Sequence, residues 1–130
     1  MGLILDTSFV VVAEREGRRG VAGAADAFLA ARGQETFAIT FTVAGELACG
    51  RSASDLRDWQ RLCRPYPVLP WTMDVAWQYG EIYRQLQSAG TLIGTNDTWI
   101  AATALVHGMG VVTRNIGEFQ RVAGLAVVAF

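Results

Sequence analysis

The stretch Gly2-Leu-Ile-Leu-Asp-Thr-Ser8 is a short apolar run that ends in an acidic residue and two hydroxyl residues. The run from Gly2 to Leu5 is typical of a buried strand, and the segment from Thr7 to Arg15 has the apolar spacing of a helix. We expect the following segment, Gly17-Arg-Arg-Gly20, to break this helix. A strand that leads directly into a helix is the unit from which parallel sheets are built.

The rest of the chain continues this alternation of strands and helices. Further helices are predicted at Val21–Ala31, from Thr42 as N-cap to Gly50, and at Ser54–Arg64, Thr72–Ser88 and Thr95–His107. Further strands are predicted at Thr36–Phe41, Tyr66–Leu69, Gly110–Thr113 and Ala126–Ala129. Because the strands are short, almost uniformly apolar and separated by helices, the sequence predicts an α/β fold in three layers. Its centre is a parallel sheet of four to five strands flanked by helices.

Length and composition limit the possible classes of protein. A chain of 130 residues with 52% hydrophobic residues is sufficient for one domain, which we expect to span residues 1–130. No apolar run approaches the roughly 20 residues that a bilayer requires, so we expect no membrane association. We also expect no signal peptide and a cytoplasmic location. Cys49 and Cys63 lack the spacing of a zinc site and are interpreted as reduced packing residues.

Four acidic residues lie where the predicted sheet would bring them together. Asp6 follows the first strand, Glu46 stands five residues past the second, Asp97 opens a helix, and Glu118 follows a later strand. The functional crevice of an open parallel sheet lies at the carboxyl ends of its strands, so we expect the four acids to converge there. Clustered oxygen ligands suit Mg²⁺ or Mn²⁺, and such ions activate water and offset charge on a phosphoryl group.

Each acid also has a simpler interpretation when taken alone. Asp6 can cap the first helix, and Asp97 can interact with the positive end of a helix dipole. Glu118 can be solvated in a polar loop, whereas Glu46 lies in an apolar helix and needs a partner such as a cation. Taken together at these positions, the four acids favour a metal site, because without a cation they would repel one another.

Four segments resemble the motifs of PIN domains of the VapC type, and together they span almost the whole chain in the expected order. They are Leu5-Asp-Thr-Ser8, Thr42–Gly50, Asn96–Leu105 and Val112–Phe119. The resemblance implies a PIN-like fold with an acidic pocket, one or two Mg²⁺ or Mn²⁺ ions, and endonucleolytic cleavage of RNA.

The same resemblance assigns site residues. It implies that Asp6, Glu46 and Asp97 are catalytic metal ligands. For the fourth acid two alternatives stay open, because some relatives place it where this chain has Asn115 and others where it has Glu118. We include Glu118 in the predicted set.

Further polar and aromatic residues complete the prediction. The residues expected to orient the acids or a water molecule are Thr7, Ser8, Asn96, Thr113 and Asn115. Those proposed for contacts with RNA phosphates are Arg15, Arg18, Arg19 and Arg114. Trp71, Trp77 and Trp99 are interpreted as core or subunit interface in preference to base-stacking residues. His107 is interpreted as a helix-end residue and not as a general base.

The resemblance further implies the toxin half of a VapBC toxin-antitoxin pair, with a VapB-like antitoxin and RNA as partners. Apolar residues expected to form the antitoxin groove are Phe28, Leu29, Leu56 and Trp59. A crowded aromatic set is expected to mediate a homodimer, namely Trp71, Trp77, Tyr79 and Tyr83. The alternatives are a housekeeping RNA-processing PIN nuclease and a PIN module that binds without cleaving.

Two other classes of enzyme are excluded by missing residues. The eleven basic residues are all arginine, and phosphatases or receiver domains with an aspartate nucleophile require a lysine. Ser8 also stands where the second acid of an Asp-x-Asp pair would be needed. No Gly-x-Gly-x-x-Gly segment follows a strand, which excludes dinucleotide binding. With a net charge of −1, any binding of nucleic acid must depend on a local surface.

Overall fold

The computed structural model describes residues 2–130, in which five strands alternate with seven helices. The strands are β1 (Gly2–Leu5), β2 (Thr36–Thr40), β3 (Val68–Leu69), β4 (Gly110–Val112) and β5 (Val127–Val128). The helices are α1 (Thr7–Arg19), α2 (Ala24–Ala31), α3 (Phe41–Cys49), α4 (Leu56–Cys63), α5 (Met73–Ser88), α6 (Thr95–His107) and α7 (Ile116–Phe119). None of the helices in residues 2–130 is long and apolar enough to cross a bilayer.

The strands form one parallel sheet in the order β3-β2-β1-β4-β5. The central strand is β1, in which Leu3 pairs with Phe37 of β2 on one side and with Gly110 of β4 on the other. The chain therefore leaves β1 in one direction across the sheet and later returns to its opposite side. This arrangement opens a crevice at the carboxyl end of β1, which is where open α/β sheets bind their ligands.

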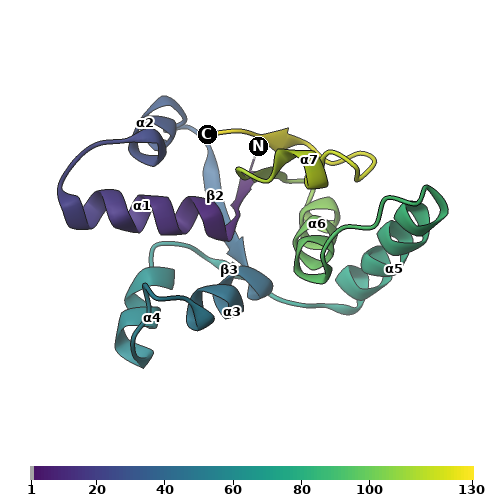
Figure 1. Ribbon diagram of the computed structural model, residues 1–130, viewed down its shortest axis with the longest axis horizontal. Helices are drawn as coiled ribbons and strands as arrows, with labels where there is room; N and C mark the ends of the chain where they lie inside the picture. Colours follow the sequence, from purple (N-terminus) through teal and green to yellow (C-terminus); the bar gives the residue numbers. More distant parts are fainter. Residues whose placement is uncertain (1) are drawn as a thin grey trace.

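Helices cover both faces of the sheet and confirm the predicted three-layer α/β fold. Figure 1 shows α1 and α2 on one side of the strands and α5 and α6 on the other. Helix α1 packs against α2, and α5 packs against α6. Helix α3 contacts both α1 and α6, so it joins the two helical layers beside the end of the sheet.

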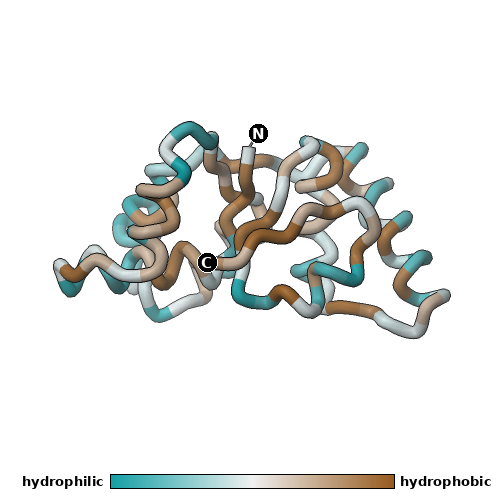
Figure 2. The backbone as a smooth tube through the Cα atoms, turned by 90° about the horizontal axis from the view of Figure 1, so that it is seen from above, coloured by the Kyte–Doolittle hydropathy of each residue, from teal (hydrophilic) through white to brown (hydrophobic). Residues whose placement is uncertain are grey.

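The hydrophobic core is centred on the strands, which are buried on both faces of the sheet. Leu3, Ile4 and Leu5 are all fully buried. Successive side chains of a strand point to opposite faces, so three buried neighbours require a cover on each side. Figure 2 shows hydrophobic colour concentrated along the strands and hydrophilic residues along the outer helices. Each large side chain removed from water contributes roughly 1.5–3 kcal/mol to folding.

The first helix is longer than the sequence predicted. Helix α1 continues through Gly17 to Arg19 and ends at Gly20, so the prediction of a break at Gly17 is wrong. A single glycine costs a helix only about 1 kcal/mol, which packing against α2 offsets. Gly20 is the residue that ends the helix, because its φ of 64° lies in the left-handed region that favours glycine.

The start of α3 is also earlier than predicted. The N-cap is Thr40, whose hydroxyl oxygen accepts a hydrogen bond of 3.0 Å from the backbone N–H of Val43. The prediction that Thr42 is the cap is therefore wrong. Thr42 is buried, and its hydroxyl oxygen accepts from the indole N–H of Trp71 at 3.0 Å.

The remaining differences concern short elements. The second helix begins at Ala24 and not at Val21, because Val21–Gly23 form the connection after α1. The fourth begins at Leu56, after Asp55 caps it with a hydrogen bond of 2.8 Å from the N–H of Asp58. The segment around Glu118, interpreted as an irregular loop, instead contains the one-turn helix α7.

Candidate active site

Four acidic side chains meet near the carboxyl edge of the sheet. Asp6 follows β1 and is the N-cap of α1, while Glu46 lies in α3, the helix that follows β2. Asp97 lies in the first turn of α6, and Glu118 lies in α7, after β4. The negative charges of Asp6, Glu46 and Glu118 all act on Asp97. The structure thus brings together the four acids that the sequence singled out.

Asp6 is held in a fixed orientation by two different hydrogen-bond donors. Its Oδ1 atom accepts from the backbone N–H of Thr7 at 2.8 Å, and its Oδ2 atom accepts from the hydroxyl of Thr113 at 2.7 Å. The hydroxyl of Ser8 lies farther away, 3.5 Å from Oδ2. Only 7% of Asp6 is exposed, so these donors replace water that the carboxylate has lost.

Glu46 is held by two neutral donors from other segments. Its Oε1 atom accepts from the hydroxyl of Thr7 at 2.7 Å, and its Oε2 atom accepts from the side-chain amide of Asn96 at 3.3 Å. Thr7 therefore contacts both acids on its side of the site, Asp6 through its backbone and Glu46 through its hydroxyl. The partners of Glu46 carry no positive charge, so they leave its negative charge in the site.

Asp97 and Glu118 form a pair that shares a hydrogen bond. The pKa of Asp97 is raised to about 7, first by its removal from water, then by this hydrogen bond, and then by the charges of Asp6, Glu118 and Glu46. The pKa of Glu118 is lowered by hydrogen bonds from Asp97 and from Asn115. Near pH 7 Asp97 is therefore close to the midpoint of its titration, and the lowered pKa of Glu118 keeps that carboxyl ionised.

The oxygen ligands at this site fit Mg²⁺ or Mn²⁺ in chemical type. Carboxylates are hard ligands, and a cation among them would relieve the repulsion that raises the pKa of Asp97. Within residues 2–130, no three acidic, cysteine or histidine side chains are already arranged as a metal-binding group. The acids accept hydrogen bonds from Thr7, Thr113, Asn96 and Asn115 instead. A carboxylate has about four lone-pair sites, so each acid can keep these hydrogen bonds and still offer an oxygen lone pair to an ion.

Three of the four arginines predicted to contact RNA lie along the later turns of α1, away from the acids. Arg15, Arg18 and Arg19 line a hollow beside the last turns of α1, and Arg18 pairs with Glu14 at 2.8 Å. Eleven residues separate Arg18 from Thr7, which corresponds to about 16 Å along the helix. Arg114 follows Thr113 directly, but its guanidinium lies over the ring of Phe130, 4.8 Å from the ring centre.

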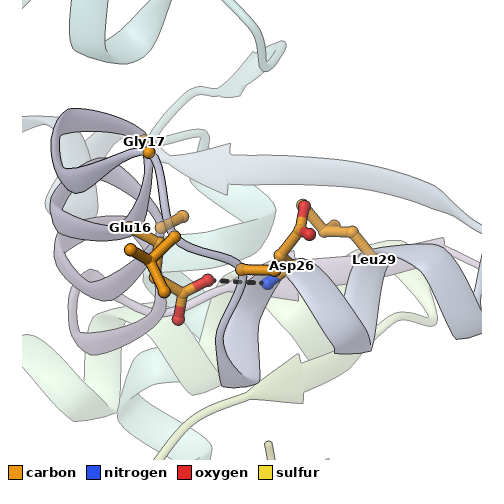
Figure 3. A pocket seen from close by; sticks show the side chains of 8 residues that line it. Glu16, Gly17, Asp26 and Leu29 are labelled. Carbon is orange, nitrogen blue, oxygen red and sulfur yellow. Dashed lines mark hydrogen bonds between the residues drawn. The ribbon is translucent and has the colours of Figure 1, made fainter.

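Glu16 is an acidic residue whose role the sequence analysis missed. It lies in α1 beside a hollow of about 420 Å³ between α1 and α2, where Figure 3 shows it with Gly17, Asp26 and Leu29. Its carboxylate accepts from the backbone N–H groups of Ala25 at 3.1 Å and Asp26 at 2.9 Å. Glu16 therefore caps α2, whose N-cap residue Gly23 has no side chain for this purpose.

Three of the aromatic residues singled out in the sequence, Trp71, Trp99 and Tyr79, form a continuous cluster. Trp71 stacks on Trp99 with ring centres 4.3 Å apart, and Trp99 contacts Tyr79 at 4.2 Å. Trp77 stands outside this cluster beside Arg84. Trp71 remains 48% exposed and Trp77 67% exposed, so much of the aromatic surface lies outside the core, as predicted.

Comparison with known proteins defines the family. The family model described as PIN domain matches residues 3–125. The chain therefore belongs to the PIN-domain family, and its parallel α/β sheet with an acidic edge agrees with this assignment.

Two curated relatives resemble this chain in sequence, one over most of its length and one over about half. The chain is 32% identical over 117 residues to Ribonuclease VapC10 of Mycobacterium tuberculosis. This match covers 90% of this chain and 86% of that protein. It is 36% identical over 63 residues to Ribonuclease VapC1 of Rickettsia felis, covering 48% of this chain. That match spans about half the length of the relative, 47%.

Solved structures show the same fold. A crystal structure of VapBC2 from Rickettsia felis bound to a promoter DNA fragment includes a chain with a TM-score of 0.83 and 25% identity. The match covers 100% of this chain and 99% of that one. FitAcB from Neisseria gonorrhoeae gives a TM-score of 0.75 at 25% identity, over 97% of this chain and 96% of that one.

Proposed function

We propose that this chain is a metal-dependent endoribonuclease and the toxin component of a type II toxin-antitoxin pair. The observation that supports the enzyme is the convergence of Asp6, Glu46, Asp97 and Glu118 near the carboxyl edge of a PIN-domain sheet. The relatives named Ribonuclease VapC support RNA as the substrate. The similarity to chains in VapBC complexes supports an antitoxin as the partner.

The four acids would hold Mg²⁺ or Mn²⁺, and this ion would activate water and offset negative charge at the scissile phosphodiester. The chain itself orients the acids. Thr113 and the N–H of Thr7 fix Asp6, and the hydroxyl of Thr7 fixes Glu46. His107 ends α6 as an exposed residue, so it contributes no general base at the four acids.

The proposal is tested by inducing the chain in a bacterial host and mapping new RNA ends. We expect new ends within minutes of induction of the wild type and none with Asp6→Asn. The purified protein should then cut an RNA that contains the mapped site when Mn²⁺ is present, and EDTA should stop it. New ends that also appear with Asp6→Asn, or cleavage that persists in EDTA, would contradict the proposed enzyme.

The surface around α1 supports the proposed antitoxin contact. One hollow, of about 460 Å³, lies between α1 and α4 and is lined by Val10, Ala13, Leu62 and Tyr66. The predicted groove residues do not line this hollow and lie in three other places. Phe28 packs on Phe9, Leu29 lines the hollow beside Glu16, and Leu56 lines a further hollow with Trp59. We propose that an antitoxin segment follows α1 across the two hollows that this helix lines, one against α2 and one against α4.

The antitoxin proposal predicts a neighbouring gene and a specific inhibition. We expect a short upstream reading frame whose product binds DNA, binds this chain and suppresses cleavage. An arginine in the C-terminal segment of that product would compete with the metal at the acids. Inhibition that is unchanged after every such arginine is replaced would contradict this competition.

The exposed aromatic surface supports a homodimer. Trp71, Trp77 and Met73 are 48%, 67% and 85% exposed, and they lie in or directly before α5. Pairing of two such surfaces would remove this apolar area from water. Sedimentation of the purified chain at micromolar concentration should give a dimer, and Trp77→Glu should give a monomer. A wild-type chain that sediments only as a monomer would contradict the dimer.

A further inference from the structure

The indole ring of Trp71 is exposed to solvent yet held in one orientation. Its Nε1–H donates a hydrogen bond of 3.0 Å to the hydroxyl oxygen of Thr42 in α3. The ring stacks on Trp99 of α6, with ring centres 4.3 Å apart and planes 20° from parallel. Nearly half of Trp71 remains accessible to solvent, and the exposed ring of Phe41 meets it edge to face at 5.6 Å. We call Phe41, Trp71 and Trp99 the aromatic platform.

Helix α3 places this platform close to Glu46. Thr42 and Glu46 are four residues apart in α3, so their side chains lie on the same face of the helix, with Cβ atoms about 5–6 Å apart. Thr42 accepts the hydrogen bond from Trp71, and Glu46 is one of the four acids. Trp71 is therefore held about one helical turn from an acid of the candidate active site.

Helix α6 leads to the same placement independently. Asn96 and Trp99 are three residues apart, so they too are neighbours on one face of their helix. Asn96 donates to Oε2 of Glu46 at 3.3 Å, while Trp99 stacks on Trp71. Contacts from two helices thus place the platform beside the acids, although residue spacing alone favoured core or subunit interface for these tryptophans.

The part of an RNA that suits this surface is a nucleobase. A base is flat and uncharged, so it can approach the carboxylates without the repulsion that a phosphate group meets there. Aromatic side chains stack on bases of every type, because every base has a π face. Successive nucleotides are about 3.4 Å apart in a base-stacked strand, so a base within about two nucleotides of a phosphate at the acids can reach the platform.

We propose that the aromatic platform stacks on one unpaired nucleobase of the substrate, within about two nucleotides of the scissile phosphodiester. The chain then requires single-stranded RNA at that point, because neighbouring pairs cover the faces of paired bases. Trp71 is assigned to RNA, and the homodimer then rests on Met73 and Trp77, which are more exposed. This inference rests on the proposed function, because it requires RNA to be cut at the four acids.

The test compares the affinity of the full chain for single-stranded and for duplex RNA. The probes are a labelled oligouridine of about twelve nucleotides and an RNA duplex of the same length, and binding is followed by fluorescence anisotropy with Mn²⁺ present. All proteins carry Asp6→Asn, so that the RNA stays intact. Trp71→Ala should weaken binding of the oligouridine by roughly 5- to 150-fold, the range for one lost stacked base, and leave duplex binding unchanged. An equal loss on both probes would overturn the inference.

Two further substitutions separate stacking from apolar packing. Trp71→Phe keeps an aromatic ring and should retain most of the affinity for oligouridine. Trp71→Leu keeps apolar volume without a ring and should lose as much as Trp71→Ala. Equal affinity in the Phe and Leu variants would overturn stacking. Leu92→Ala is the matched control, because Leu92 is 47% exposed, stands just before α6 and is not aromatic, so its affinity should not change.

Sedimentation separates the base contact from a subunit contact. Trp71→Ala should keep the oligomeric state of its parent, and conversion to a monomer would assign Trp71 to the subunit interface and overturn the inference. Unchanged affinity for oligouridine in Trp71→Ala would overturn it as well, while leaving the proposed nuclease intact. A parent protein that binds neither probe would contradict RNA as the substrate, and with it both proposals.

Discussion

Glu16 and Asp97 are both partly buried acids in this chain, yet their surroundings shift their pKa values in opposite directions. Glu16 accepts two backbone N–H groups from the start of α2, and these bonds, led by that from Asp26, lower its pKa. Asp97 has lost water and faces Asp6, Glu46 and Glu118, and its pKa is raised to about 7. One acid is favoured in its charged form, and the other is not.

The difference separates a structural acid from an acid of a binding site. The surroundings of Glu16 supply the hydrogen bonds that a carboxylate needs, so Glu16 joins α1 to α2 without a ligand. The surroundings of Asp97 add negative charge, which destabilises its ionised form until a proton or a cation offsets it. Hydrogen bonding alone would not distinguish the two, because both acids have partners.

The largest predicted effect is on RNA cleavage. Asp97→Asn removes a proposed metal ligand and should lower the rate by at least about 100-fold, by comparison with the loss of a single group that stabilises charge in an active site. Glu16→Gln should cleave at a rate close to that of the wild type, because Glu16 lies outside the cluster. Rates are compared on one RNA at saturating Mn²⁺. A similar loss in both variants would mean that Asp97 also acts through folding.

The sequence was sufficient to predict the fold and the convergence of the four acids, whose role as metal ligands stays a prediction. Asp6 stands directly after an apolar strand, Glu46 lies in the helix that follows the second strand, and Asp97 lies in the first turn of its helix. The parallel topology determines which of these residues meet. These positions depend on the order of strands and helices, which hydrophobic spacing reveals. The prediction of these positions therefore holds even when the end of an element is misplaced by two residues, as when Thr42 and not Thr40 is taken as the cap.

The contacts between the acids and other side chains were less predictable. The one-turn helix α7 is too short for a periodic pattern, although the spacing from Asn115 to Glu118 is similar to that of a capping box. That signal would have predicted the helix but a wrong role for Asn115, whose side chain faces the acids. The role of Glu16 depends on how α1 packs against α2, which no local pattern of residues specifies.

The second prediction concerns thermal stability with metal. Mn²⁺ at about 100 times its dissociation constant should stabilise the wild type by about 2.7 kcal/mol, seen as a rise in melting temperature. The rise should be the same in Glu16→Gln and much smaller in Asp97→Asn. Ca²⁺-free buffer and an EDTA baseline define the reference. An equal rise in all three proteins would place the bound ion elsewhere on the surface.

The third prediction concerns the pH dependence of the metal-free protein. The pKa of Asp97 is raised in the folded state, so its contribution to stability is fully present below its ordinary value of 3.8 and is lost as pH rises through about 7. Because solvent screens this partly exposed group, we expect a change on the order of 1–2 kcal/mol. Asp97→Asn should remove this dependence in urea unfolding in EDTA. A wild-type profile that matches the variant's would contradict the raised pKa.

The smallest predicted effect has the opposite sign and belongs to Glu16. Its pKa is lowered in the folded state, so its contribution is present above the unfolded pKa and is lost as pH falls through the folded one. Glu16→Gln should therefore lower the melting temperature modestly at pH 7 and hardly at all at pH 3. The reason is that protonation of Glu16 in the wild type already weakens its bonds to Ala25 and Asp26. Glu14→Gln is the matched control, since Glu14 pairs with the exposed Arg18 in the same helix. If Glu16→Gln and Glu14→Gln change the melting temperature equally at both pH values, the cap on α2 adds nothing beyond an ordinary surface charge.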